Sequence, residues 1–436
     1  MKLRQNPRLG ETLYETELEN GLTVKIYPKS GYHKIYAILT TNYGSIDKTF
    51  IPAGETDYVT VPDGIAHFLE HKLFEKKDYD AFEKFGRYGA SSNAFTSFTR
   101  TSYLFSTTSH LRENLDILLD FVQEPYFSTE TVEKEKGIIG QEIQMYNDEP
   151  DWRLFYTVIG NLYPSHPVRT DIAGTVDSIA QITPEALYQA HATFYQPSNM
   201  NLFIVGQIDD PDEVVDWLNA NQAAKTFAQP TEIVRSLPEE AEDGHDIIPY
   251  RSLEMPITRS KSMVGIKGLT DYGTGELALE TKLKMNLLLE LLLGDSSTQV
   301  QKLYDDGTLD DSFGYEFAIQ RSFNFVTLGG DADNAQELSD AIINILEHAT
   351  ESPDFSEDNL ALVKRAAIGE YLQAFNSLEA IANQYSDEFF TEISPFDVLG
   401  LIEQVTLADL QQMATDYFKI ETMTVCHILP EGANHA

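Results

Sequence analysis

Basic residues are scarce in this chain of 436 residues. Lysine and arginine total 31 against 69 aspartate and glutamate residues, which gives a formal net charge of −38. Neither a basic patch nor a basic tail is visible, so the charge excludes a nucleic-acid-binding protein. A negative field favours cationic or neutral peptides as ligands over acidic ones, although many proteins are acidic for solubility alone.

Cysteine and long apolar runs are also nearly missing. Cys426 is the single cysteine, which excludes an intramolecular disulfide and fits a reducing compartment. The longest apolar run, residues 287–293, is short and broken by Glu290, so no segment is expected to span a membrane. The basic N-terminus lacks the apolar stretch of a signal peptide. We therefore expect a soluble, cytoplasmic protein without a membrane partner.

The most informative stretch is residues 67–71, which read His-Phe-Leu-Glu-His. On a helix, His67 and His71 are four residues apart and lie on one face, about a turn from each other. Two neutral imidazoles in this arrangement can bind one Zn²⁺, and Glu70 can serve as the base for a water molecule beside it. The order is inverted relative to the commoner H-E-x-x-H, which indicates the inverzincin class of zinc peptidases.

The alternative is a solvated helix that carries these residues by chance. With ten histidines in the chain, a chance match is expected in on the order of a few per hundred chains. The apolar neighbours argue against chance, because they predict a largely buried helix; they are Ile65, Ala66, Phe68, Leu69, Leu73 and Phe74. Buried histidines and a buried glutamate need partners, and a metal ion satisfies all three.

A helix predicted after Phe127 offers a third ligand. Catalytic zinc usually has three protein ligands and an open fourth position. Ser128 or Thr129 can cap the start of this helix, and Glu135 and Glu142 then lie two turns apart on one face. On spacing alone, a ligand role for Glu142 and a pair of solvated surface charges are equally consistent with the sequence.

These motifs and two further segments resemble one known family. The segment 89–97, Gly-Ala-Ser-Ser-Asn-Ala-Phe-Thr-Ser, resembles an edge strand of the M16 zinc metallopeptidases (pitrilysin, insulinase and mitochondrial processing peptidase). Residues 163–167, Tyr-Pro-Ser-His-Pro, resemble the short proline-rich loop of that family. The similarity extends over nearly the whole chain. It is strongest to short, two-domain bacterial members that are encoded as pairs, specifically to the zinc-bearing partner.

The resemblance implies a set of roles around one zinc ion per chain. His67, His71 and Glu142 are then the metal ligands, and Glu70 is the general base. Glu135 is the second residue that we assign to catalysis, because the resemblance implies that it orients a ligand histidine or the base.

The resemblance also implies a place for the substrate. Asn93 and Ala94 would lie on an edge strand and pair with an extended substrate backbone by strand addition. Without the resemblance, Asn93 reads as an ordinary turn or bulge residue. His166 reads as a hydrogen-bonding loop residue rather than a ligand.

An internal duplication organises the chain. Residues 183–202 align without a gap with residues 406–425, and residues 127–130 match residues 355–358. Two halves therefore share one fold, and a polar, proline-punctuated stretch between them reads as a linker. We predict an N-terminal domain with the zinc site at residues 1–228, a linker at 229–248, and a C-terminal domain at 249–436.

Strand and helix patterns are segregated within each half. Alternating runs at 23–27 and 34–40 predict strands, whereas periodic stretches at 111–122 and 338–349 predict helices. Strands clustered apart from helices predict an α+β fold in which each homologous domain packs helices on a mainly antiparallel sheet. The resemblance implies that the two halves face each other as a half-shell.

The second half lacks the metal-binding residues. Met285, Leu288 and Leu289 stand at the positions of the H-x-x-E-H motif in the duplicated register, and they cannot hold zinc. Only Glu370 remains, at the position of Glu142, and we interpret it as structural.

The chain departs from the family at two further positions. Active members use an arginine and, seven residues later, a tyrosine on the substrate carbonyl, and the matching residues here are Tyr304 and Asp311. Either another chain supplies the pair, or the protein is weak or inactive alone. The expected partner is a homologous two-domain subunit that supplies the arginine and the tyrosine, and the other arrangement is a homodimer. We predict a zinc-dependent endopeptidase acting on peptides or small unfolded polypeptides as one subunit of a heterodimer. The alternative is a non-catalytic peptide-binding or scaffold subunit that retains a metal site.

Overall fold

A computed structural model of the protein describes residues 1–6, 10–241, 244–387 and 393–432. The chain divides into two compact units that interleave in sequence. Unit 1 comprises Met1–Ile143, Asp171–Leu237 and Ala374–Asp387, and unit 2 comprises Gln144–Thr170, Pro238–Gln373 and Glu388–Ala436.

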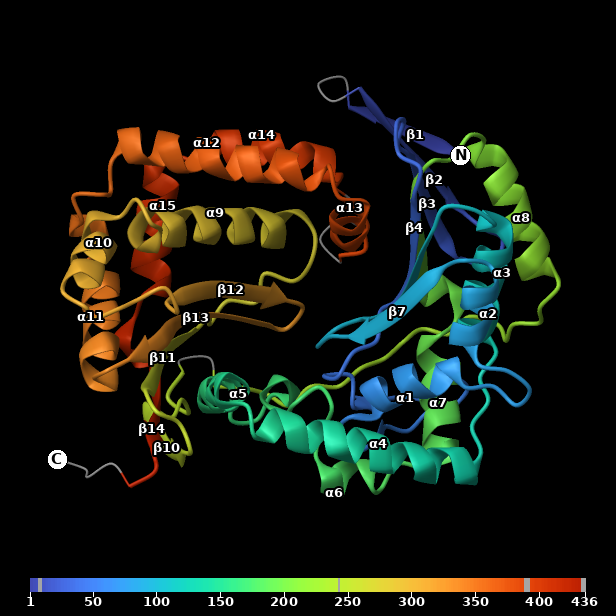
Figure 1. Ribbon diagram of the computed structural model, residues 1–436, viewed down its shortest axis with the longest axis horizontal. Helices are drawn as coiled ribbons and strands as arrows, with labels where there is room; N and C mark the ends of the chain where they lie inside the picture. Colours follow the sequence, from blue (N-terminus) through green and yellow to red (C-terminus); the bar gives the residue numbers. More distant parts are fainter. Residues whose placement is uncertain (7–9, 242–243, 388–392, 433–436) are drawn as a thin grey trace. The chain divides into compact units, whose positions relative to one another are not determined.

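Unit 1 is built on a seven-stranded sheet (Figure 1). In spatial order its strands are β1 (Lys2–Asn6), β2 (Glu11–Glu17), β3 (Thr23–Pro28), β9 (Met200–Gly206), β4 (Ile35–Thr41), β8 (Thr101–Thr107) and β7 (Ser91–Thr96). Strands β3 and β9 run parallel, and the other neighbouring pairs are antiparallel. A separate two-stranded ribbon joins β5 (Thr49–Phe50) and β6 (Val59–Thr60).

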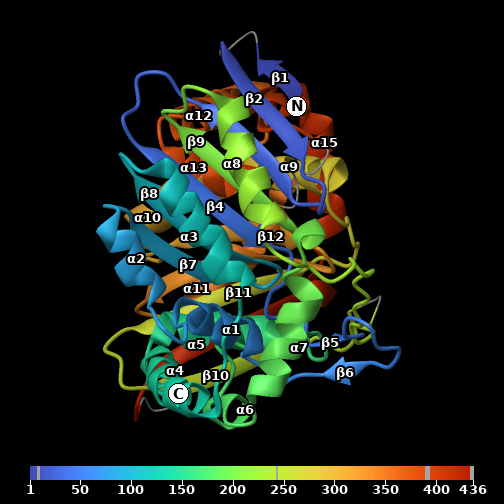
Figure 2. The same ribbon diagram turned by 90° about the vertical axis from the view of Figure 1, so that its right-hand side faces the viewer.

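Helices cover both faces of this sheet. The helices that lie wholly or mainly in unit 1 are α1 (Ile65–Phe74), α2 (Ala81–Arg87), α3 (Leu111–Gln123), α4 (Thr129–Asn147), α6 (Val176–Ile179), α7 (Pro184–Phe194), α8 (Pro211–Ala223) and α13 (Leu378–Tyr385). Helix α3 packs on β4 and β8 and against α8, as Figure 2 shows. Helix α13 contacts β4 and β9 from the other side, where the Tyr385 ring stacks on Phe203 with 4.8 Å between centroids. Because both faces are covered, every residue of β4 is buried.

Unit 2 repeats the plan with a five-stranded sheet. In spatial order its strands are β10 (Tyr250–Met255), β14 (Met423–Pro430), β11 (Ser260–Lys267), β13 (Phe323–Ala332) and β12 (Gly314–Gln320). Its helices are α5 (Pro150–Leu162), α9 (Glu276–Leu293), α10 (Thr298–Asp305), α11 (Ala335–Glu347), α12 (Glu357–Ala374), α14 (Val398–Gln404) and α15 (Leu407–Tyr417). Strands β10 and β14 run parallel, and the remaining neighbours are antiparallel.

The predicted α+β fold, with two halves that each pack helices on a mainly antiparallel sheet, is confirmed. The two halves also exchange a helix. Helix α5, from the first half of the sequence, packs on β11 and β14 of unit 2, whereas α13, from the second half, packs on the sheet of unit 1. The predicted domain boundaries, at residues 228 and 249, refer to the repeat in the sequence rather than to these compact units, and they stay a prediction.

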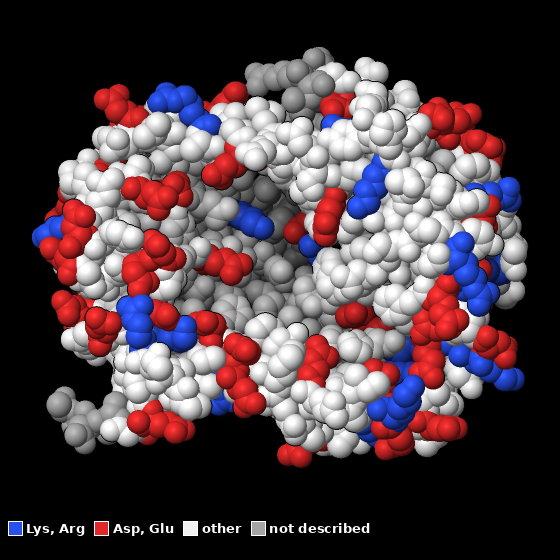
Figure 3. Space-filling model, in the orientation of Figure 1, with Lys and Arg blue, Asp and Glu red and all other residues white. Residues whose placement is uncertain are grey.

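Charge is distributed as the composition leads one to expect. On the face seen in Figure 3, acidic side chains are scattered among uncharged residues, and lysine and arginine occur singly or in small groups. Among the described residues, no helix is both long enough and apolar enough to cross a bilayer.

Candidate metal centre and its surroundings

Helix α1 holds His67 and His71 on its accessible side while most of the helix is buried. It begins after Gly64, whose φ of 88° is left-handed. A Cβ at Gly64 would lie 2.4 Å from the carbonyl oxygen of Ala173, so only glycine fits this start. Phe68, on the buried side, has no exposed surface and anchors the helix in the core. The two imidazole rings lie 4.5 Å apart between centroids.

Helix α4 brings Glu142 to the two histidines. Glu142 Oε1 lies 3.7 Å from His67 Nε2, and Glu142 Oε2 lies 3.8 Å from His71 Nε2. These separations are too long for hydrogen bonds. They suit a shared cation, because ligand atoms about 2.1 Å from a tetrahedral zinc lie roughly 3.4 Å apart. Within the described ranges, this is the only group of three histidine, cysteine or acidic residues whose ligand atoms converge, all within 4.8 Å of one another.

Glu135, two turns before Glu142, fixes the orientation of the His71 ring. Its Oε1 lies 3.1 Å from His71 Nδ1, which donates to this carboxylate, and Nε2 therefore points toward Glu142. Burial lowers the pKa of His71, but the hydrogen bond to Glu135 and the nearby carboxylates raise that pKa overall. Burial and the charge of His71 lower the pKa of His67 to about 3, so His67 is neutral, as a metal ligand must be.

One ring nitrogen has no hydrogen-bonding group opposite it. His67 Nδ1 is buried and has no hydrogen-bond partner among the described residues. Nε2, on the side of Glu142, is therefore the ring nitrogen placed to bind a cation, and the donor set of two imidazoles and one carboxylate fits zinc.

Glu70 lies on α1 next to the converging group. Only 7% of its surface is exposed. Burial raises the pKa of this carboxyl and the charge of Glu142 adds to the rise, whereas Thr96 and His71 act in the opposite direction. The Thr96 hydroxyl donates a 2.7 Å hydrogen bond to Glu70 Oε2. Sequence reasoning missed this contact, because no spacing rule links a residue on an edge strand to one on a helix.

Asn93 and Ala94 lie on β7, at the edge of the seven-stranded sheet. On one side, Asn93 pairs with Leu104 and Ala94 pairs with Tyr103 of β8. Within the described part of the chain, no strand pairs with the other side of β7. The Ala94 N–H donates to Asn93 Oδ1 at 2.9 Å, so a side chain occupies a backbone donor of this strand.

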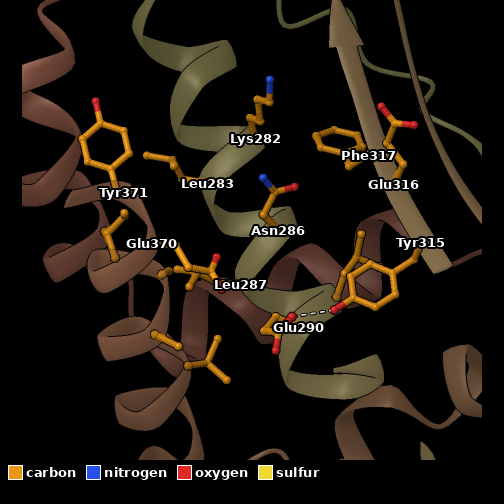
Figure 4. Close-up of a pocket in the computed structure, with 15 residues that line it drawn as sticks. Lys282, Leu283, Asn286, Leu287, Glu290, Tyr315, Glu316, Phe317, Glu370 and Tyr371 are labelled. Carbon is orange, nitrogen blue, oxygen red and sulfur yellow. Dashed lines mark hydrogen bonds between the residues drawn. The ribbon is translucent and has the colours of Figure 1, made fainter. Parts of the chain in front are cut away.

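The corresponding elements of unit 2 enclose a pocket (Figure 4). Helices α9 and α12 and strand β12 line a volume of about 520 Å³. Leu289 and Glu370, the counterparts of His71 and Glu142 in the duplicated register, both line it. Glu290 accepts a 2.5 Å hydrogen bond from the Tyr315 hydroxyl. This lining contains no histidine, in agreement with our interpretation of Glu370 as structural.

Tyr304 and Asp311 form a pair with each other. The Tyr304 hydroxyl donates to Asp311 Oδ1 at 2.9 Å, and Tyr304 is 51% exposed. The hydrogen bond to Asp311 raises the pKa of Tyr304, so the phenol keeps its proton. Neither residue supplies the cation that an arginine at this position would carry.

Comparison with known proteins decides the family. Residues 50–176 match the family described as Insulinase (Peptidase family M16), and residues 181–367 match the domain described as Peptidase M16 inactive domain. The chain belongs to the M16 family of zinc peptidases. The family predicted from the sequence motifs is therefore confirmed.

M16 relatives match the chain over its whole length. YmfH of Bacillus subtilis, described as an uncharacterized zinc protease, is 47% identical over 426 residues, which cover 98% of each chain. An M16-like peptidase from Alicyclobacillus acidocaldarius has a crystal structure with a TM-score of 0.92 and 34% identity, covering 98% of this chain and 100% of that one. A protease from Helicobacter pylori shares the fold, with a TM-score of 0.81 at 20% identity over 96% and 99% of the two chains.

Proposed function

We propose that this M16 chain is a zinc-dependent endopeptidase that hydrolyses peptides or small unfolded polypeptides. The proposal depends on one observation, the convergence of His67, His71 and Glu142 beside the buried carboxyl of Glu70. A buried acid next to three metal-binding side chains is costly for stability and is typical of a functional site. YmfH is named a zinc protease, which supports the same chemistry here.

In this proposal His67, His71 and Glu142 hold one zinc ion per chain. Bound zinc supplies a Lewis acid that polarises the scissile carbonyl and lowers the pKa of a water molecule. Glu135 keeps Nε2 of His71 turned toward the other ligands through its hydrogen bond to Nδ1.

Glu70 is the general base in this proposal. It takes a proton from the attacking water and passes it to the leaving amine, which requires a carboxylate that can both accept and return the proton. Burial raises the pKa of Glu70, and a raised pKa makes its carboxylate a stronger base. Its position next to His71 in sequence keeps it beside the metal ligands.

The free edge of β7 is the proposed substrate-binding surface. An extended peptide would add as a further strand, and one of its carbonyls would replace Asn93 Oδ1 as the acceptor of the Ala94 N–H. Strand addition needs an unpaired backbone, so unfolded segments are substrates and folded domains are not. The net charge of −38 favours neutral or cationic peptides.

A second subunit completes the catalytic site in this proposal. Tyr304 and Asp311 occupy the positions of the family's arginine and tyrosine and bond to each other. A homologous two-domain subunit without H-x-x-E-H would supply the missing pair. A homodimer is the other arrangement, and it would leave the pair missing, because a second copy carries the same Tyr304 and Asp311. The single cysteine, Cys426, is buried and free, which supports a reducing, cytoplasmic location.

A scaffold role is the second candidate function. The observation in its favour is the Tyr304–Asp311 pair, because a chain without the family's arginine and tyrosine lacks two groups that stabilise charge on the substrate carbonyl. In that case the chain binds peptides and a metal without turnover.

A quenched-peptide assay separates these candidates. The chain is assayed alone and then with co-purifying or co-encoded proteins of similar size, with and without a metal chelator. We expect weak turnover alone and strong, chelator-sensitive turnover with the partner. Full chelator-sensitive turnover by a verified monomer would refute the shared site, and an inert complex would favour the scaffold.

A further inference from the structure

The buried carboxylate of Glu70 depends on one neighbour. Within the described residues, the Thr96 hydroxyl is the only hydrogen-bond donor that the structure gives to this carboxylate, at 2.7 Å from Oε2. A carboxylate with little access to water needs at least one donor to hold it in a single orientation. Because Thr96 engages Oε2, the other oxygen, Oε1, is left to exchange a proton.

Thr96 is itself held in place by its surroundings. It is the last residue of β7, and the turn that follows is closed by the Ser97 N–H donating to the Arg100 carbonyl at 2.8 Å. The Ser45 N–H also donates to the Ser97 carbonyl, at 3.1 Å. A Cβ at Gly44 would lie 2.4 Å from the Phe98 carbonyl oxygen, so the two backbone segments meet as closely as glycine allows. The hydroxyl of Thr96 is therefore presented from a fixed backbone.

Thr96 also shares its strand with the proposed substrate-binding positions. Ala94 and Thr96 are two residues apart on β7, so their side chains point to the same face of the sheet. The strand edge that would pair with a substrate therefore carries, at its end, the group that orients the base. A displacement of β7 along its own axis would move both together.

We infer that Thr96 is a positioning residue for the peptidase reaction, which holds the base Glu70 in its reactive orientation from the substrate-binding strand. The inference rests on the proposed function, because it gives Glu70 its role. It adds that base orientation and substrate register are set by one element, β7. Within the described residues, the Thr96 hydroxyl donates to Glu70 and to none of the three metal ligands, so we expect its effect on the rate of the chemical step.

Two substitutions at position 96 test this. Thr96→Val keeps the shape of the side chain and removes the hydroxyl, whereas Thr96→Ser keeps the hydroxyl. A hydrogen bond to a charged group holds its orientation more strongly than one between neutral groups, so we expect Thr96→Val to lower kcat by ~10-fold or more. KM and zinc content should stay at wild-type values, and Thr96→Ser should restore most of kcat.

A matched control removes a comparable hydroxyl away from the base. Thr107, on the neighbouring strand β8, donates to the Ser109 carbonyl at 2.7 Å and does not contact Glu70. Thr107→Val should therefore leave kcat unchanged. The Thr107→Val variant measures how much the free energy of unfolding falls when one threonine hydroxyl is removed from this sheet without an effect on Glu70.

The outcomes separate this inference from the proposed function. An unchanged kcat in Thr96→Val overturns the inference while the peptidase proposal stands. Loss of zinc together with kcat, or failure of Thr96→Ser to restore activity, also overturns it, because the residue would then be merely structural. If the wild-type chain shows no turnover with any partner, the peptidase proposal fails. A crystal structure of Thr96→Val in which Glu70 keeps its orientation would still contradict this inference.

Discussion

Glu70 and Glu142 are two glutamates beside the same pair of histidines, yet they have different partners. Glu142 directs both carboxylate oxygens toward imidazole nitrogens, at 3.7 and 3.8 Å, without forming hydrogen bonds. Glu70 is more deeply buried and accepts a hydrogen bond from Thr96. Their partners therefore support the proposed ligand role of Glu142 and the proposed base role of Glu70.

At the scale of single residues, the ligand assignment predicts a loss of metal. His67→Ala removes one of three ligands, so the remaining two should not hold zinc against solvent. The purified wild-type chain should contain about one zinc per molecule, and the variant close to none. Metal analysis measures this directly, and full occupancy in His67→Ala would remove the proposed site.

The hydrogen bond between Glu135 and His71 predicts a graded effect. Glu135→Gln keeps the side-chain size but weakens the interaction that orients the His71 ring. Loss of such support commonly costs ~10–100-fold in metal affinity, which a zinc competition titration measures. Glu133→Gln is the matched control, because Glu133 lies on the same helix, is exposed and, within the described residues, pairs with Lys136 rather than with a histidine. Equal affinities in the two variants would contradict the role of Glu135.

The sequence predicted the residues of this site unevenly. Spacing on one helix was enough for His67, Glu70 and His71, because a four-residue interval fixes which side chains share a face. Glu142 stayed open on spacing alone, since the distance between two helices depends on packing. Thr96 could not be predicted, because its contact with Glu70 joins a strand to a helix through tertiary structure.

At the scale of elements, two glycines with the same backbone conformation but different surroundings allow the cost of backbone strain to be measured apart from the cost of steric overlap. Gly64 and Gly31 have φ of 88° and 86°, but only Gly64 has close neighbours, since a Cβ added there would lie 2.4 Å from the Ala173 carbonyl oxygen. Gly31→Ala should cost only the strain of a left-handed alanine, about 1–3 kcal/mol in the free energy of unfolding. Gly64→Ala should cost more, because the start of α1 must also shift.

Chemical denaturation and zinc titration together measure these two costs. The shift of α1 should also weaken zinc binding in Gly64→Ala, since His67 lies three residues into that helix. Gly31→Ala should bind zinc normally. Equal losses of stability in both variants, with unchanged zinc affinity, would show that the start of α1 does not position the metal ligands.

Element boundaries were less predictable than element types. The strands expected at 23–27 and 34–40 and the helix expected at 111–122 correspond to β3, β4 and α3. The helix expected at 338–349 instead spans Ala335–Glu347. The periodic apolar pattern did not include the cap, in which the Asn334 side chain accepts hydrogen bonds from the Gln336 and Glu337 N–H groups.

At the scale of the whole molecule, the exchanged helices predict that the two halves depend on each other. Helix α5 packs on β11 and β14, and the Asn161 amide donates to Thr424 Oγ1 of β14 at 3.0 Å. The hydroxyl of Tyr163, the residue after α5, donates to the Asn324 carbonyl of β13 at 2.7 Å. A fragment of residues 1–228 would expose the packing face of α5 and would lack α13. This exchange could not be predicted from the sequence. An internal repeat shows that the two halves have similar sequences, but it does not show on which sheet each helix packs.

We therefore expect the fragment 1–228 to aggregate or to unfold without cooperativity, whereas the full chain unfolds cooperatively. Size-exclusion chromatography and thermal unfolding followed by circular dichroism measure both properties. A fragment containing residues 1–237 joined to 374–387 but lacking 144–170 is the matched control, because it corresponds to unit 1. A monomeric, cooperatively folded fragment 1–228 would show that the exchanged helices do not couple the halves.

We propose that this chain is a zinc peptidase whose proton transfer depends on Glu70. The most direct measurement is the quenched-peptide turnover of zinc-loaded Glu70→Gln, assayed with the partner that gives the wild-type chain its full activity. A general base commonly contributes ~10²–10⁴-fold to the rate, so turnover should fall by at least ~10²-fold while one zinc per chain is retained. Wild-type turnover by Glu70→Gln with its zinc in place would show that Glu70 is not the general base.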